Sequence, residues 1–194
     1  MSLALALSHL CRQLEDLGRA YAVVGGLAAS ARGDIRFTRD VNVAVDVTDD
    51  EDAEAVVFAL RELGYEILAT VEQQATARLS TSRLRSPEAD VVCDLIFATS
   101  GIEEEVVDSA TRLELFAGQS VPTATTESLL AMKILSASPQ RPRDLGDIQA
   151  LHRAHPELDE ARVRALLRAI SARGFDRGAQ LEEKWRRLRE QLGV

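Results

Sequence analysis

Two polar side chains interrupt a valine-rich run at Asp40-Val41-Asn42-Val43. Because side chains on a β-strand alternate between its two faces, Asp40 and Asn42 project from the same side. Magnesium prefers oxygen ligands and is usually held by one or two carboxylates together with substrate phosphates. The spacing therefore predicts half of a metal site, with Asp40 and Asn42 as ligands.

Gly25 and Gly26 end an apolar run that begins at Tyr21, and 13 residues separate them from Asp40. We expect a strand at 21–24, a glycine turn, a short helix at 27–32 and a second strand that carries Asp40. Without a Cβ at the two glycines, the amide hydrogens there and at the helix start can face phosphate oxygens. The turn is therefore a candidate site for a nucleotide triphosphate.

Asp94 is a third candidate metal ligand, in the apolar run 91–97. A charge in a buried strand is costly unless it is paired or bound to a cation. Metal binding would satisfy it. An ion pair with Arg36, Arg39 or Arg83 is the alternative.

Lys133 stands out because the chain has 21 arginines and only two lysines, yet this lysine lies in an apolar helical run. A compact ammonium can neutralise a phosphate where a planar guanidinium would not fit. The alternative is a lysine whose stem packs on the helix while its charge reaches solvent. In either case we expect a solvent-facing side chain.

Asp144 and Asp147 are spaced i and i+3, near the start of an expected helix at 144–152, and so share one face. A carboxylate there could position or deprotonate an acceptor hydroxyl. The alternative is that Asp144 caps the helix N-terminus, which needs no catalysis.

In order and spacing, these pieces resemble the nucleotidyltransferase superfamily that includes DNA polymerase β and, more narrowly, the AbiEii-type nucleotidyltransferase toxins. Residues 21–47 are similar to the family's first motif, 91–96 to the strand that brings a third carboxylate, and 126–151 to its lysine-containing helix and the following Arg-x-Asp segment. The resemblance implies transfer of a nucleoside monophosphate from a Mg²⁺-bound NTP to an acceptor hydroxyl, with one or two ions.

The same resemblance points to a phosphate contact for Lys133, and Arg39 joins it with Gly25 and Gly26 among the candidate nucleotide contacts. An RNA end is one acceptor that the resemblance allows, beside a protein or small-molecule hydroxyl. A cognate antitoxin is the partner that it implies.

Asn42 departs from the family, whose active members have aspartate there. The amide is isosteric with a carboxylate but neutral, so a second ion loses a negative ligand. An engineered change, natural loss of catalysis and recruitment of another carboxylate all remain open, although Asp46 lies ~13 Å along the strand and is a poor substitute. The rival function is an inactive module of the same fold that binds a nucleotide or a partner.

The chain has 194 residues and a net charge of −8, which by itself disfavours a nucleic-acid partner. Residues 1–130 have 10 Lys and Arg against 22 Asp and Glu, whereas residues 131–194 have 13 against 9. A basic C-terminal part suits a polyanion, and a solvated helix surface is the alternative. Cys11 and Cys93 lie in apolar contexts and are too few for a disulfide framework. We see neither a signal peptide nor a membrane span and expect a cytoplasmic protein.

Hydrophobic periodicity predicts helices at 3–17 and 49–63 and strands at 65–68, 75–80 and 90–97, with a turn-rich stretch at 82–87. From about residue 125 the strand pattern ends, and amphipathic helices are expected at 127–135, 144–152, 159–171 and 179–191. The fold class is therefore α/β (α+β), a mixed sheet flanked by helices. We expect a nucleotidyltransferase-like domain at 1–124 and a helical C-terminal domain at 125–194.

Overall fold

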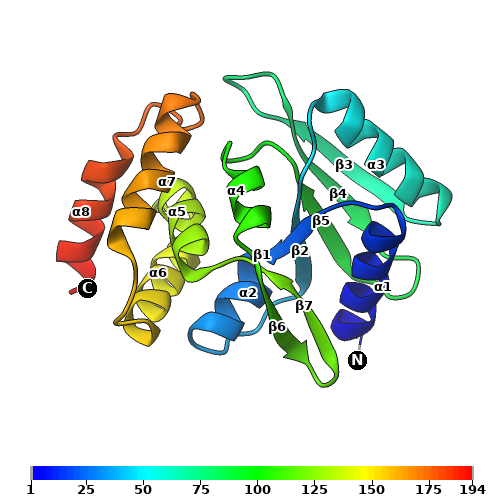
Figure 1. The fold of residues 1–194 in the computed structure, drawn as a ribbon, viewed down its shortest axis with the longest axis horizontal. Helices are drawn as coiled ribbons and strands as arrows, with labels where there is room; N and C mark the ends of the chain where they lie inside the picture. Colours follow the sequence, from blue (N-terminus) through cyan, green and yellow to red (C-terminus); the bar gives the residue numbers. More distant parts are fainter. Residues whose placement is uncertain (1, 194) are drawn as a thin grey trace.

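A computed structural model describes residues 2–193 as one mixed sheet with helices on both faces (Figure 1). The strands, in the spatial order β3-β4-β5-β2-β1-β7-β6, are β1 (Tyr21–Val24), β2 (Asp40–Val45), β3 (Glu66–Glu72), β4 (Leu79–Arg85), β5 (Val92–Ile96), β6 (Thr111–Phe116) and β7 (Gln119–Thr123). The helices are α1 (Ser2–Asp16), α2 (Gly25–Arg32), α3 (Asp50–Glu62), α4 (Glu103–Asp108), α5 (Thr126–Ser136), α6 (Pro142–Ala154), α7 (Glu160–Ala172) and α8 (Leu181–Leu192). The fold class expected from the sequence is confirmed.

Alternation along β2 assigns its side chains to two different environments. Val41, Val43 and Val45 are fully buried in the core that α1 and α3 cover. Ala44 belongs to the second core, on the face covered by α4 and the C-terminal helices (Figure 1). Asp40 and Asn42 share the face of Ala44, because they lie four and two residues before it.

Three neighbouring strands bring the polar residues into one row. In the register of the sheet, Val24 lies opposite Asn42, Asn42 opposite Asp94, and Asp94 opposite Arg83. Asn42 is therefore the direct neighbour of Asp94, whereas Asp40 is displaced by two residues, roughly 8 Å between Cα atoms at ordinary strand spacings. The row ends at β1, where Val24 leads into α2.

Several expected strand boundaries were wrong, and the strand expected at 65–68 is β3, which runs through Glu72. The strand expected at 75–80 is β4, which runs through Arg85 and includes most of the stretch taken for turns. Its residues 82–85 alternate between buried and exposed, and the arginines lie on the exposed side, so their polarity concealed the strand pattern. We also did not expect α4 or the β6–β7 hairpin. The helices after residue 125 are confirmed, with ends shifted by one to two residues.

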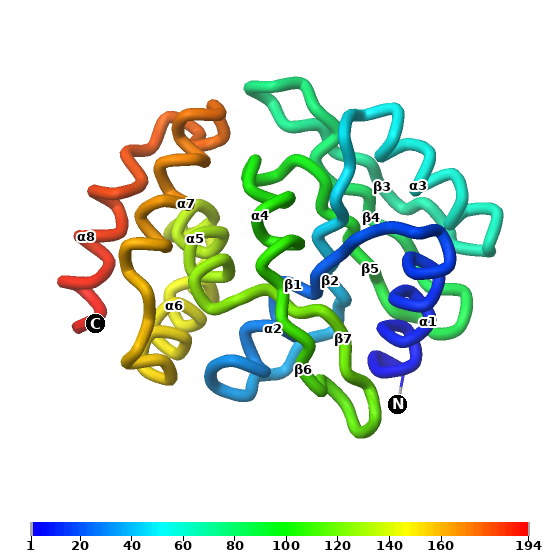
Figure 2. The backbone as a smooth tube through the Cα atoms, viewed as in Figure 1, coloured from blue at the N-terminus to red at the C-terminus, as the bar shows by residue number. Residues whose placement is uncertain are grey.

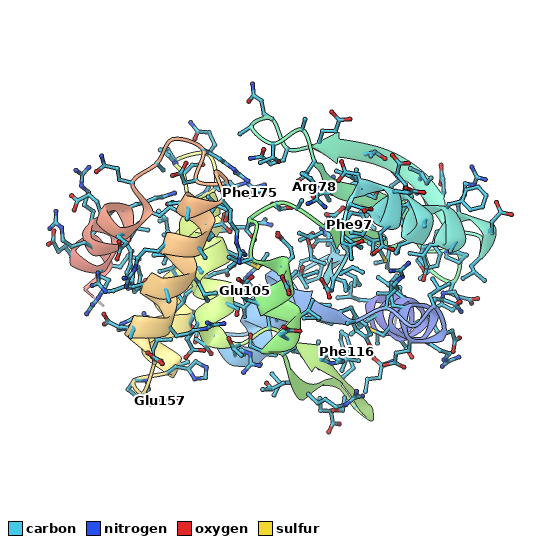
Figure 3. All side chains as sticks on the ribbon, turned by 45° about the horizontal axis from the view of Figure 1, so that its top comes forward. Arg78, Phe97, Glu105, Phe116, Glu157 and Phe175 are labelled. Carbon is cyan, nitrogen blue, oxygen red and sulfur yellow. The ribbon has the colours of Figure 1, made fainter. Side chains whose placement is uncertain are left out.

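The C-terminal helices pack against α2 and share a core with the sheet, and Figure 2 shows them on the side of the molecule where α2 and α4 lie. One continuous core joins Ala22, Val24 and Ala44 to buried side chains of α5–α8. An ion pair between Glu105 of α4 and Arg173, just after α7, also crosses this contact, and Figure 3 labels Glu105 where α4 faces the helices. The division of the chain at residue 124 into two domains stays a prediction.

Cys11 and Cys93 are buried and free, as expected for thiols in apolar contexts. Burial raises the pKa of Cys11 to about 11 and that of Cys93 to about 12. Within residues 2–193, none of the helices combines the length and apolar character needed to cross a bilayer.

Candidate active site

A cleft of about 660 Å³ opens between the end of the sheet and the start of α6. Its walls come from the glycine turn, the segment before β2, the beginning of β2, α5 and the loop into α6. The lining residues are Gly25, Gly26, Arg36, Phe37, Thr38, Arg39, Asp40, Asn42, Lys133, Gln140, Arg141, Pro142, Arg143 and Asp144. Seven of the nine site residues predicted from the sequence thus line one cleft, and Asp94 and Asp147 do not.

The glycine turn is shaped by contacts that other residues would break. Gly25 has a φ of +65°, and a Cβ there would come within 2.9 Å of the Asn42 side chain. A Cβ on Gly26 would lie 2.7 Å from the Thr38 hydroxyl. Val24 provides no side-chain cap for α2, so its first amide hydrogens stay available to an anion in the cleft.

Asp40 is held by neutral donors. The Thr38 hydroxyl donates to its Oδ1 at 2.8 Å, and the Asn42 amide donates to its Oδ2 at 3.0 Å. Burial alone would raise the pKa of Asp40, but the hydrogen bonds from Asn42 and Thr38 outweigh it and lower that pKa below its ordinary value. Asp40 is therefore a carboxylate at neutral pH, and no cation bonds to it within the described chain.

Asp94 has the partner that we weighed as the alternative to a metal. The Arg83 guanidinium bonds both of its carboxylate oxygens, each at 2.8 Å. The Asp94 side chain is 8% exposed, while that of Arg83 is 54% exposed. Hydrogen bonding and charge from Asp94 raise the pKa of Arg83, and the charge of Asp40 adds to the effect. Arg83 is one of the three arginines that we weighed as partners of Asp94, and metal binding by Asp94 stays a prediction.

Lys133 bridges the two aspartates of α6, at 2.7 Å from Asp144 and 2.8 Å from Asp147. Arg36 forms a bidentate pair with Asp147 at 2.7 and 3.0 Å, and Ser136 donates to Asp144. The side chain of Lys133 is only 14% exposed, so the expectation that it faces solvent was wrong. It lines the cleft on one side and is anchored by carboxylates on the other.

Asp144 does not cap the helix N-terminus, contrary to the alternative above. α6 begins at Pro142 with Arg141 at the N-cap, so Asp144 is the third residue of the helix, and it uses both oxygens elsewhere. Asp147 is 5% exposed and lies behind the cleft surface, with its oxygens taken by Arg36 and Lys133. Their contacts give both aspartates a positioning role; proton transfer from an acceptor stays a prediction.

Sequence reasoning missed Arg36 and Thr38 as site residues. Thr38 lies two residues before Asp40 in an extended segment, so the alternation that pairs Asp40 with Asn42 also indicates Thr38. Arg36 meets an aspartate 111 positions away, and nothing local signals that contact. Arg39 is exposed at the cleft mouth, with its guanidinium carbon 5.2 Å from the centroid of the Phe37 ring.

The residues present fit one Mg²⁺ ion and not two. Asp40 supplies one carboxylate and Asn42 one amide oxygen beside the donors for phosphate, which suits an ion that takes its remaining ligands from phosphates and water. A second ion needs a shared carboxylate, which Asn42 cannot supply. Asp94 is occupied by Arg83. Within residues 2–193 no group of three or more His, Cys, Asp or Glu side chains is placed to hold a metal.

Residues 8–192 match the sequence profile of the AbiEii family, described as "Nucleotidyl transferase AbiEii toxin, Type IV TA system". The match spans almost the whole chain. The chain therefore belongs to the AbiEii nucleotidyltransferase toxin family, and the resemblance found in its motifs is confirmed. Among curated protein sequences there is no match.

Solved structures share the fold at low sequence identity. The antibiotic-resistance factor ANT(2'')-Ia is 18% identical over 89% of this chain and 94% of its own, with a TM-score of 0.56. An antigenic nucleotidyltransferase-like protein from Paracoccidioides brasiliensis is 23% identical over 93% and 92%, with a TM-score of 0.51. A putative nucleotidyltransferase from H. pylori is 16% identical over 97% and 90%, with a TM-score of 0.52. These similarities identify a nucleotidyltransferase fold.

Proposed function

We propose that the cleft binds a Mg²⁺-nucleoside triphosphate and supports transfer of its nucleoside monophosphate to an acceptor hydroxyl, at a rate limited by Asn42. The observation that carries the proposal is the convergence of the glycine turn, the Asp40 carboxylate and Lys133 on one cleft. The acceptor hydroxyl loses its proton to solvent as its oxygen attacks the α-phosphorus, the bond from that phosphorus to the α–β bridging oxygen breaks, and pyrophosphate leaves. One Mg²⁺ ion at Asp40 supplies positive charge to the phosphates when bound.

The glycine turn, Lys133 and Asp144 each have a task in this reaction. The amides of Gly25 and Gly26 bind phosphate oxygens at the N-terminus of α2. Lys133 neutralises phosphate charge, and Asp144 fixes the position of its ammonium through the 2.7 Å contact. Such fixed donors stabilise the charge that moves to the leaving pyrophosphate, without reorganisation during the reaction.

The acceptor we favour is an RNA end. Arg39, Arg141 and Arg143 are exposed and line the mouth of the cleft, which suits a polyanion. An antitoxin that counteracts the activity is the partner that we infer from the family's description as part of a toxin–antitoxin system.

Asn42→Asp tests the proposal. It places a second carboxylate on the cleft surface, and we expect transfer activity to rise by about 10²-fold, the scale of one electrostatic contributor. The assay incubates each form with labelled NTPs, Mg²⁺ and total RNA, and scores labelled RNA. Equal activity in both forms would show that position 42 does not bind the metal ion.

A second candidate, a nucleotide-binding module without catalysis, is favoured by the Arg83–Asp94 pair, which neutralises the third carboxylate. Saturable nucleotide binding with no transfer, in the native form and in Asn42→Asp alike, is the result that would select this candidate. Nucleotide binding is therefore measured beside transfer, by titration of fluorescent ATP and GTP analogues.

A further inference from the structure

The row Asp40, Asn42, Asp94 and Arg83, which we call the sheet cluster, contains two negative charges and one positive charge. If position 42 were an aspartate and Arg83 were absent, carboxylates at positions 40, 42 and 94 would lie close together on two neighbouring strands. Their charges would then need bound cations. In this chain the amide removes one negative charge, and Arg83 adds a positive one. Both differences reduce the negative charge that bound cations would have to balance.

We propose that the Arg83 guanidinium takes the place of the second metal ion, so that the cleft binds nucleotide with a single divalent cation. The proposal rests on the nucleotide-binding function above and deepens it by fixing the number of ions. Two contacts carry it. Arg83 satisfies both oxygens of Asp94, and Asn42, the direct neighbour of Asp94, leaves that aspartate without a second carboxylate beside it.

The exposure of the pair supports the same conclusion. Asp94 is buried, so it needs a permanent counter-charge to be an anion in the absence of ligand. Arg83 has 54% of its side chain exposed, and the charge of Asp40 contributes to its raised pKa, so the guanidinium lies within electrostatic reach of Asp40. A guanidinium is always charged and matches a carboxylate in a bidentate way, so it is a lasting substitute for an ion that would otherwise dissociate.

The ion count tests the proposal directly. Mn²⁺ is titrated into each form with a saturating non-hydrolysable α,β-methylene NTP analogue, and bound Mn²⁺ is measured by loss of the free-ion electron paramagnetic resonance signal. We expect one ion per native protein, one in Asn42→Asp, and two in Asn42→Asp/Arg83→Gln, which frees Asp94 and restores the third charge. Two ions in the native protein or in Asn42→Asp would overturn the proposal, as would one ion in the double variant.

Arg83→Gln alone gives a second measurement that does not depend on counting ions. It leaves the charge of Asp94, the neighbour of Asn42 in the sheet, uncompensated, and we expect about tenfold weaker binding of the analogue, the effect of one charge ~10 Å away at an effective dielectric constant of ~20. Arg85→Gln is the matched control, because Arg85 lies two residues further on the same strand and pairs with two exposed acids, Glu66 and Asp90. Unchanged affinity in Arg83→Gln would count against the proposal.

Folding is controlled in the same series. If Arg83→Gln is unstable, Mg²⁺ without nucleotide should raise its Tm more than that of the native protein, because a cation then replaces the lost guanidinium at Asp94. Arg83→Lys keeps the charge and should stay folded with one ion. Absence of nucleotide binding in every form, with a native Tm, would instead reject the proposed function, and this inference would fall with it.

Discussion

Two charged clusters meet at the cleft, and their construction is opposite. The helix cluster (Arg36, Lys133, Asp144 and Asp147) is nearly closed: each carboxylate oxygen has a donor, and the two aspartates are 5–7% exposed. In the sheet cluster, Asp40 is half-buried and has only neutral donors. The helix cluster is already neutralised by the protein, whereas Asp40 still has a charge to offer a ligand.

This difference separates stability from function. A buried ionic network is strongly destabilised when one partner is removed, because the remaining charge stays buried and unpaired. A half-buried carboxylate with neutral donors contributes less to stability and keeps its affinity for cations. We therefore expect substitutions in the helix cluster to change mainly the free energy of unfolding, and those at Asp40 and Asn42 to change mainly ligand binding.

The largest effect is expected for Asp147→Ala. It removes the partner shared by Arg36 and Lys133, and should lower the free energy of unfolding by about 3 kcal/mol. Arg36 is 28% exposed and can regain water, which places the loss at the lower end for such pairs. Chemical denaturation measures it. Glu62→Ala, which removes one exposed partner of Arg61, is the control and should change stability by less than about 0.5 kcal/mol. Similar values for the two variants would contradict the closed-network description.

Lys133→Met comes next, at about 2 kcal/mol, because the apolar stem is kept while two aspartates lose a cation. Asp147 keeps Arg36 and Asp144 keeps Ser136, so the loss is smaller than for Asp147→Ala. Denaturation and nucleotide titration are run on the same samples. If the folded fraction of the variant binds nucleotide more weakly, Lys133 contacts phosphate in addition to its structural role. If the affinity is unchanged, its role is limited to the ion pairs of the helix cluster.

The local part of the site could be predicted from the sequence. The strand alternation that aligns Asp40 with Asn42 and the glycine turn that approaches them depend on neighbours within about 20 residues, where periodicity and backbone freedom decide the geometry. The long amphipathic helices were predicted for the same reason. The predicted helix ends differ from the observed ends by one or two residues, because capping rather than hydrophobic periodicity decides where a helix ends.

The partners of the charged residues could not be predicted. Asp94 had three candidate arginines, and only the register of β4 against β5 selects Arg83. Lys133 was expected in solvent because nothing in α5 shows that α6 folds back with two aspartates towards it. Arginines on the exposed face of β4 also hid a strand, since the polar pattern was taken for turns. The partners of Asp94 and Lys133 are decided by contacts between elements that lie far apart in the sequence.

In the sheet cluster, Asp40→Asn should have a smaller effect, with a characteristic pH dependence. The pKa of Asp40 is lowered in the folded protein, so its contribution is present above the unfolded value near 3.8 and is lost as the pH falls through the folded value. We expect the free energy of unfolding of the native protein to be about 1 kcal/mol larger than that of the variant at pH 6. This difference should become smaller below pH ~4. Urea denaturation at several pH values measures it, and a gap that widens on acidification would be the wrong sign.

Gly146→Ala should have the smallest effect, and in the stabilising direction. Gly146 lies inside α6 between Asp144 and Asp147, and a Cβ there would meet nothing within 4 Å. Alanine restricts the unfolded chain without strain in the helix, so we expect a gain of about 0.4–1 kcal/mol. Gly25→Ala is the contrasting variant in the cleft, because a φ of +65° and the 2.9 Å approach to Asn42 should make it destabilising. A loss of stability in Gly146→Ala would show that the helix cluster needs a distortion of α6 that only glycine permits.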